Sequence, residues 1–251
     1  MGTENNFNRA ILAVIIFIVL VGVFGWMVCY FYNVSMQKFS ISKIKSIHAE
    51  LIQASRLSAL VHNEDMGVFK TDMPVNLFAE KYFTPYLNIN SYCKGSQDNC
   101  WKTPQYVDLH GTPYFNKSMY SVVLTDGVVI GFNKDKNNLV NLIVDVNGKV
   151  KPNKLGHDVF IFSVYNAETP PGICKKSEYN KSALYSGIHF GGLDKCGIPH
   201  DAYGYSELTD ATFEDGCSNK SPASVSGFGA GSACLAVLKH NSWNIDKNYP
   251  W

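Results

Sequence analysis

The chain has 251 residues, a length that allows one large domain or two small ones. It carries 22 Lys and Arg against 21 Asp and Glu, a formal net charge of +1. Because phosphate neutralisation needs a clustered basic surface, this balance argues against a nucleic-acid-binding protein. Hydrophobic residues make up 46% of the chain, which excludes an intrinsically disordered protein.

The first predicted element is a transmembrane helix over residues 10–37, after a short leader at 1–9. The helix holds no charged residue, and Ile11–Tyr32 is almost entirely apolar. With a rise of about 1.5 Å per residue, such a helix exceeds a hydrocarbon core of roughly 30 Å. The alternative is a cleavable signal peptide, whose apolar region is usually about 7–15 residues long and ends in small residues. Here the run is longer and ends in aromatic residues, which favours an uncleaved anchor in membrane lipid.

The orientation of this anchor depends on two conflicting signals. Lys38, Lys43 and Lys45 follow the span, so the positive-inside rule alone would place the large domain in the cytoplasm. Six cysteines also follow the span, with no C-x-x-C pair, which favours up to three disulfides in any of 15 pairings. We therefore expect the large domain to lie outside the cytoplasm. The disulfide candidates are Cys93, Cys100, Cys174, Cys196, Cys217 and Cys234.

The helical pattern continues over residues 38–70. Apolar residues recur there at spacings of three or four, which predicts a helix that lays one apolar stripe on a soluble core. We expect one continuous helix that ends at Gly67; the alternative is two helices with a break near Asn33–Ser35. The stripe consists of Ile41, Ile44, Ile47, Leu51, Ala54, Leu57 and Val61.

Residues 71–251 are predicted to form an α+β globular domain. Asp126–Gly127 indicates a hairpin with a two-residue type I′ turn, and three or four antiparallel strands lie at about 120–165. The long helix would cover one face of this small sheet. The expected elements are a short helix or an extended connector at Leu77–Phe83 and strands at Ser121–Leu124, Val128–Phe132, Leu139–Val146 and Val159–Tyr165.

The last third of the chain is predicted to depend on disulfides. Residues 166–227 are rich in Gly, Ser, Asn and Tyr, bury little apolar surface and therefore need covalent links to stay ordered. In the segment 228–251, a short helix is expected at Ala230–His240, followed by an aromatic tail. We expect Trp243, Tyr249 and Trp251 in this tail to pack on the sheet or on the loop.

One group of side chains could bind a metal ion. Asp145, Asn147, Asn153 and Asp158 place oxygen atoms at a strand–turn–strand junction, where Ca²⁺ could take some of them as ligands. The spacing is not that of an EF-hand, and Asx turns explain the same residues without a metal. No other cofactor is indicated. The seven histidines are scattered, with no HExxH or GxSxG motif, so we expect no enzyme.

Several segments carry a family resemblance. They are Phe83–Tyr86, the strand–DG–strand unit, Val144–Gly148, Gly156–Phe162 and the terminal Asn-Tyr-Pro-Trp. With the long apolar helix, they make the chain resemble type IV pilins and pseudopilins. The resemblance implies a helix whose first half is membrane-embedded, a small antiparallel sheet and a disulfide-closed C-terminal loop. The chain departs from the family pattern because its apolar run contains no Glu and no Gly precedes a Phe-Thr-Leu sequence.

This resemblance implies a minor or atypical subunit of a type IV pilus or of a type II secretion pseudopilus. Such a subunit would lie in a bacterial inner membrane, with its C-terminal domain periplasmic or extracellular. It would assemble with other pilin-like subunits and the assembly machinery through its N-terminal helix. The alternatives are a single-pass binding or sensor module that does not assemble, and an extracytoplasmic hydrolase. The helix residues expected to mediate assembly are Ile11, Val14, Ile15, Ile18 and Val21.

Overall fold

The computed structural model divides the chain into two compact units, residues 1–39 and 40–251, and each is described by itself. The side chains of residues 2–11 and of Lys94 lie outside the described part. The described residues are 2–94, 100–101, 106–113, 119–134, 139–166, 186–194, 196–223 and 228–251.

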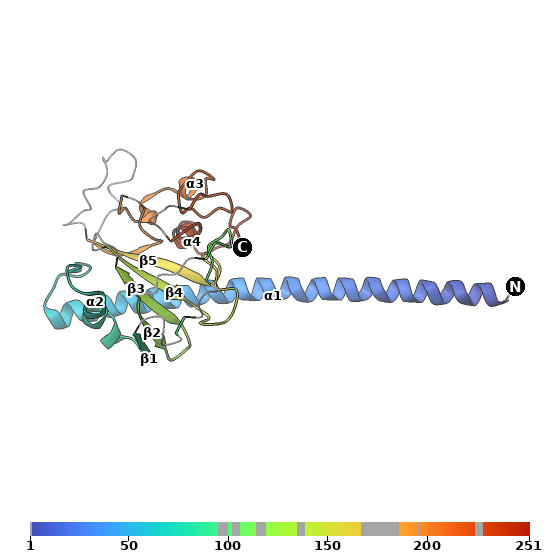
Figure 1. The fold of residues 1–251 in the computed structure, drawn as a ribbon, viewed down its shortest axis with the longest axis horizontal. Helices are drawn as coiled ribbons and strands as arrows, with labels where there is room; N and C mark the ends of the chain where they lie inside the picture. The colour runs from blue at the N-terminus through green and yellow to red at the C-terminus, as the bar shows by residue number, and fades with distance from the viewer. Residues whose placement is uncertain are drawn as a thin grey trace. The chain divides into compact units, whose positions relative to one another are not determined.

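The first element is one continuous helix, α1 (Gly2–His62), which belongs to both units (Figure 1). This confirms the continuous helix and excludes a break near Asn33–Ser35. The predicted end at Gly67 is wrong. Asn63, with φ 51°, takes the left-handed conformation directly after the last helical turn, and Asn is one of the residues that tolerate it.

The second unit contains a six-stranded antiparallel sheet in the order β1-β2-β3-β4-β5-β6. Only the four inner strands were predicted. The two edge strands escaped prediction because the sequence of β1 is mostly polar and β6 has only four residues. The strands are β1 (Ile89–Lys94), β2 (Tyr120–Leu124), β3 (Val129–Lys134), β4 (Val140–Asp145), β5 (Val159–Tyr165) and β6 (Gly187–Phe190).

The turn between β2 and β3 differs from the predicted type I′ turn. Gly127 has φ 87°, but Asp126 has no positive φ. The amide of Gly127 donates to the carbonyl of Leu124 at 3.0 Å, and the amide of Leu124 donates to the carbonyl of Val128 at 2.8 Å. These bonds close a three-residue loop, in which a type I turn is followed by a left-handed glycine.

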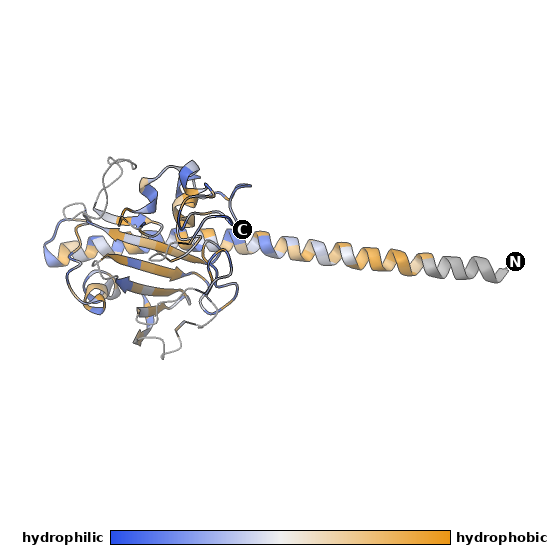
Figure 2. Ribbon diagram, turned by 45° about the horizontal axis from the view of Figure 1, so that its top comes forward, coloured by the Kyte–Doolittle hydropathy of each residue, from blue (hydrophilic) through white to orange (hydrophobic). Residues whose placement is uncertain are grey.

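Both faces of the sheet are covered, whereas the sequence predicted one covered face. Leu142 and Phe162 pair across β4 and β5 and belong to the same apolar cluster as α1. The next pair, Ile143 and Ile161, points to the opposite face and packs with Trp101 in a second cluster. This alternation follows from the two-residue period of a strand. Figure 2 shows the hydrophobic colouring of these central strands.

The predicted stripe of α1 holds only for its first part. Ile44, Ile47, Leu51 and Ala54 are fully buried, and Ile41 packs against the same cluster. The last two members of the stripe, Leu57 and Val61, are exposed instead. Steps of 3.6 residues from Ile47 and Leu51 lead to position 58, so the buried side of the last turns carries Ser58. Its hydroxyl donates to the carbonyl of Lys81 at 2.9 Å.

Short helices complete the second unit. α2 (Val75–Tyr82) begins two residues before the predicted start and packs Phe78 and Tyr82 around Phe69. A 3₁₀ turn, η4 (His200–Ala202), and α3 (Tyr205–Leu208) lie within the region predicted as a loop. The last helix, α4 (Cys234–His240), begins four residues later than expected. Gly231 explains this late start, because its φ of 102° is incompatible with a helix.

Candidate functional site

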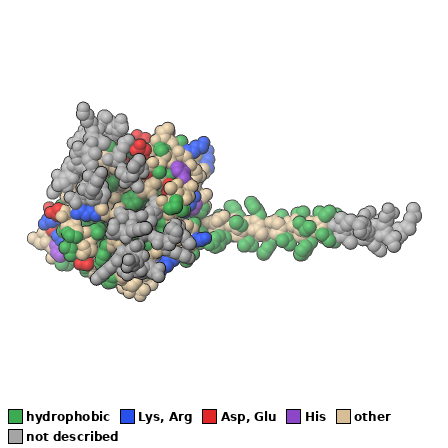
Figure 3. Space-filling view, in the orientation of Figure 1, with side chains coloured by type: hydrophobic (Ala, Val, Ile, Leu, Met, Phe, Trp, Pro, Cys, Tyr) green, Lys and Arg blue, Asp and Glu red, His purple; other side chains and the backbone are tan. Residues whose placement is uncertain are grey.

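The most extended candidate surface is the apolar part of α1 in the first unit. Four of the five residues predicted for assembly, Val14, Ile15, Ile18 and Val21, are between 52% and 63% exposed. The side chain of the fifth, Ile11, lies outside the described part. Large apolar side chains from Leu12 to Tyr32 are exposed at consecutive positions and therefore on all sides of the helix. Figure 3 shows some of them in green on the face that it draws.

In the described part of the chain, α1 is the one helix that is long and apolar enough to cross a membrane, judged by length and composition. Its backbone hydrogen bonds are formed within the helix, which is the condition for crossing hydrocarbon. Each Å² of apolar surface removed from water contributes roughly 25 cal/mol, so an uncovered helix of this kind is unfavourable in water. The surface can be covered by lipid or by apolar helices of other chains.

Two cysteine pairs lie at disulfide distance. Cys93 and Cys100 have Cα atoms 6.1 Å apart, and Cys217 and Cys234 have Cα atoms 4.6 Å apart. Cys196 is also disulfide-bonded, while Cys174 lies outside the described residues. Both pairs join cysteines that are consecutive among the candidates, and the second pair joins the loop after α3 to the start of α4.

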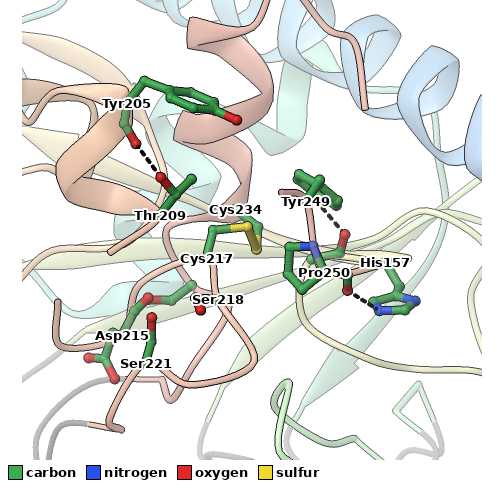
Figure 4. Close-up of a disulfide and its surroundings, with 12 residues drawn as sticks. His157, Tyr205, Thr209, Asp215, Cys217, Ser218, Ser221, Cys234, Tyr249 and Pro250 are labelled. Carbon is green, nitrogen blue, oxygen red and sulfur yellow. Dashed lines mark hydrogen bonds between the residues drawn. A yellow bond between two sulfur atoms is a disulfide. The ribbon is translucent and has the colours of Figure 1, made fainter. Parts of the chain in front are cut away.

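The second disulfide lies against the chain terminus and the loop between β4 and β5 (Figure 4). The Tyr249 hydroxyl donates to the carbonyl of Gly156 at 2.5 Å, and a side chain at Gly156 would come within 2.8 Å of the Cys234 sulfur. His157 Nε2 lies 3.0 Å from the Pro250 carbonyl oxygen. Its ring stacks on Trp251 with centroids 4.8 Å apart. The disulfide, the tail and this loop therefore form one packed region.

The aromatic tail packs on the sheet, as predicted, and on the loop between β4 and β5, where the prediction names the 166–227 loop. Tyr249 is buried, and Trp251 stacks on His157. Trp243 contacts Phe190 of β6 edge to face, with ring centroids 5.7 Å apart. The tail therefore contacts both the sheet and the loop that follows β4.

The four residues of the predicted calcium site lie in or beside this loop, which we call the 146–158 loop. Asp145 and Asp158 are at most 1% exposed. Asp145 accepts hydrogen bonds from the Tyr106 hydroxyl at 2.5 Å and from the Asn147 amide at 3.2 Å. Asp158 accepts from the backbone amides of Asn153 at 2.8 Å and of Lys154 at 2.7 Å. All four carboxylate oxygens thus already hold a protein donor.

The two asparagines also have local roles. Asn153 has φ 51° and is fully buried. With its amide oriented for hydrogen bonding, the nitrogen donates to the carbonyls of Val150 at 2.8 Å and Gly148 at 3.2 Å. Both polar side-chain atoms of Asn147 are buried without a hydrogen bond. Within the described ranges, no three or more His, Cys, Asp or Glu residues are grouped so as to hold a metal ion, and calcium stays a prediction.

Burial changes the ionisation of this carboxylate pair. It raises the pKa of Asp158 to about 6, against the hydrogen bonds from the Lys154 and Asn153 amides. Burial also raises the pKa of Asp145 well above its ordinary value, and the charge of Asp158 adds to this effect, whereas the Tyr106 hydrogen bond opposes it. Tyr106 was missed at the sequence level because nothing in its local pattern indicates the pairing with Asp145.

A second buried polar cluster lies between β6 and α4. His189 Nδ1 lies 2.8 Å from a carboxylate oxygen of Asp201, and His189 is fully buried. His200 is also fully buried, and burial lowers its pKa although the charges of Asp215 and Asp194 oppose the shift. No sequence pattern predicted this cluster, because the histidines and aspartates share no recognised motif.

A surface pocket of about 760 Å³ lies beside this cluster. Asp194, which lines it, accepts hydrogen bonds from two backbone amides and from the Tyr203 hydroxyl at 2.5 Å. Asp210 accepts from the amide and the hydroxyl of Thr212. These carboxylates therefore stabilise their own loops. The pocket is lined by Asp194, Cys196, Tyr203, Ser206, Glu207, Asp210, Thr212, Phe213 and Glu214.

The comparisons with known proteins identify no relative. No family model matches the chain, and no curated protein or solved structure is significantly similar to it.

Proposed function

We propose that this chain is a pilin-like structural subunit, anchored in a bacterial inner membrane by the first half of α1. It acts by assembly rather than catalysis, as a minor or atypical member of a type IV pilus or type II secretion pseudopilus. The observation that carries the proposal is the change along α1. Its first half exposes apolar side chains on all sides, and its second half buries one face against an antiparallel sheet.

The disulfide pairs support the compartment assigned in this proposal. Two cysteine pairs at disulfide distance and a third bonded cysteine are typical of proteins that fold in an oxidising compartment. In this proposal the chain has a single anchor near the N-terminus, and the second unit lies in the periplasm or outside the cell. The partners are membrane lipid, other pilin-like subunits and their assembly machinery.

The first test is the intact mass of the protein from native membranes, with and without reduction and alkylation. Removal of the leader, with an added methyl group, would mean that a prepilin peptidase processes the chain, as the proposal expects. A full-length mass would favour a permanent anchor. Besides the free Cys29, six thiols that become reactive only on reduction are expected, and free thiols among these six in the native protein would contradict the proposed topology.

The second test measures assembly directly. A photo-crosslinking amino acid at Ile18 should give adducts with other apolar helices in native membranes, because this side chain is exposed in the first unit. The matched control places the same crosslinker at Gln53, an exposed polar position of α1 in the second unit. Adducts to lipid alone at position 18 would contradict assembly.

A second candidate function is a single-pass extracytoplasmic binding or sensor module. The observation that favours it is the absence of a Glu from the apolar run. In pilins this Glu is thought to pair with a neighbouring subunit's terminal amine. A full-length mass together with lipid-only crosslinks would select this function over the filament subunit.

A further inference from the structure

Three lysines follow the apolar run of α1, and neither anchoring nor assembly through that run gives them a role. They are Lys38, Lys43 and Lys45, and under the positive-inside rule they count against a second unit outside the cytoplasm. Lys38 and Lys45 are exposed, whereas Lys43 is half-buried. The surroundings of Lys43 and Lys45 in the second unit show which surface these cations belong to.

The start of α1 in the second unit lies beside two turns of the sheet. Lys43 Nζ is 2.6 Å from a carboxylate oxygen of Asp126, in the turn between β2 and β3. A side chain at Gly148 would come within 2.8 Å of the Gly127 carbonyl oxygen of the same turn. The 146–158 loop therefore lies at the end of the sheet where α1 enters the second unit.

Cations from separate segments gather at this end. The 146–158 loop carries Lys149 and Lys151, which are exposed, and Lys154, which is half-buried. Lys45 Nζ lies 5.7 Å from the ring centroid of Trp243 in the tail, and the tail is bonded to this loop through the Tyr249 hydroxyl. We call Lys45, Lys149, Lys151 and Lys154 the basic surface.

The carboxyl groups of these segments do not neutralise the basic surface. Asp145 and Asp158 are at most 1% exposed, and Asp126 is already ion-paired. In the tail, Asp246 and Lys247 are adjacent and offset each other. Among the ion pairs of the residues that the structure describes, none includes a member of the basic surface. An anionic partner would therefore meet uncompensated positive charge.

We infer that the basic surface contacts anionic phospholipid headgroups of the membrane that α1 spans. The inference rests on the membrane anchor of the proposed function, but on neither assembly nor topology. From Tyr32 to Ser40 the helix continues for eight residues, or about 12 Å at 1.5 Å per residue. A headgroup region adds about 5–8 Å to each side of the hydrocarbon core. The chain itself thus holds this end of the second unit near lipid headgroups.

The charge and shape of the loop fit such a surface. Each lysine close to an anionic membrane strengthens the attraction roughly fivefold. Val150, between Lys149 and Lys151, is 59% exposed and is the one large apolar residue exposed in this fully described loop. An aliphatic side chain flanked by two cations can enter the headgroup region while the ammonium groups stay at the phosphates. An acidic protein would match the charge, but the short connection to the span favours lipid.

The test is photo-crosslinking of the full chain in lipid nanodiscs with EDTA, which excludes bridging by divalent cations. The crosslinking amino acid replaces Val150, and the discs contain phosphatidylcholine alone or mixed with phosphatidylglycerol. We expect at least about fivefold more lipid adducts in the anionic discs. The excess should disappear in 1 M salt, where the Debye length is about 3 Å. The matched control is Leu60, which is 76% exposed and lies about 25 Å further along α1 than Lys43.

Lysine variants separate charge from proximity. With the crosslinker at position 150, Lys149→Gln together with Lys151→Gln should lower the adduct yield in anionic discs about 5- to 25-fold. Lys70→Gln, at an exposed position beyond the end of α1, should leave the yield unchanged. All three lysines are exposed, so the variants keep the buried core intact.

The outcomes distinguish this inference from the anchor on which it rests. Co-elution of the chain with both kinds of disc, but equal adduct yields in them, would overturn the lipid contact and leave the anchor standing. A yield that the loop variants do not change, or adducts to protein in place of lipid, would also overturn it. Failure of the chain to enter either kind of disc would contradict the anchor and the inference together.

Discussion

The two halves of α1 have the same secondary structure but opposite relations to their surroundings. Between Leu12 and Tyr32 the large apolar side chains are exposed on every side, whereas from Ser40 onward one face of the helix is buried and the other is exposed. Helix formation is therefore not what distinguishes them. The first half has enough apolar surface to require an external partner, and the second half finds its partner in the sheet of its own unit.

The largest expected effect tests the first half. Ile15→Lys together with Ile18→Lys should make membrane integration less favourable by up to about 6 kcal/mol, because a Lys costs about 3 kcal/mol at the centre of a span and less toward its ends. The fraction resistant to carbonate extraction measures this. Ser42→Lys, on the exposed face of the second half, is the matched control and should leave integration unchanged. Full integration of the double variant would mean that this half is not a membrane span.

The next effect tests the second half. Leu51→Ala should lower the free energy of unfolding by 2–5 kcal/mol, because Leu51 is fully buried against the sheet. Leu60→Ala, at a position that is 76% exposed, should change it by less than about 0.5 kcal/mol. Denaturant titration in mild detergent measures the free energy of unfolding of both variants. Equal effects would contradict the packing of α1 on the sheet.

Removal of a disulfide should act on the second unit alone. Cys217→Ser with Cys234→Ser opens a loop with a sequence separation of 17, which should cost about 3 kcal/mol of stability. Thermal unfolding of the second unit should shift, while membrane integration of the first half stays the same. A stability loss equal to that of Cys29→Ser, which removes a free cysteine, would argue against a structural disulfide.

The smallest effect concerns the tail. Tyr249→Phe removes the hydroxyl that donates to Gly156 and leaves the Gly156 carbonyl unpaired, at a cost of about 1 kcal/mol. Chemical denaturation measures the loss, and Tyr92→Phe at an exposed position serves as the control. An unchanged midpoint would mean that ring packing alone holds the tail.

Sequence patterns identified the elements that depend on local or periodic signals. The apolar run predicted the first half of α1, and β5 was placed at Val159–Tyr165 as observed. The turn at Asp126–Gly127 was located but its type was wrong, because the choice between a two- and a three-residue loop depends on the register of the strands that it joins. Edge strand β6 was missed, since a four-residue strand is stabilised mainly by its neighbour β5.

The candidate sites also divide into features that the sequence predicted and features that depend on the fold. Cysteine counting predicted disulfides, but it left 15 pairings open because spacing does not report distance in the fold. The four residues of the calcium prediction lie in or beside the 146–158 loop, and the bound calcium stays a prediction. The sequence did not indicate Tyr106, which lies 39 residues before Asp145 and reaches it only through the fold. His200 was missed for the same reason.

The sequence by itself determined the continuous apolar helix and the four inner strands, because hydrophobic periodicity and a charge-free run are local properties of a chain. Tertiary structure decided which face of α1 is buried in its last turns, which cysteines approach one another and which carboxyl groups lose water. These three features depend on contacts between residues far apart in sequence. Such contacts form only when other segments of the chain pack against the two faces of the sheet.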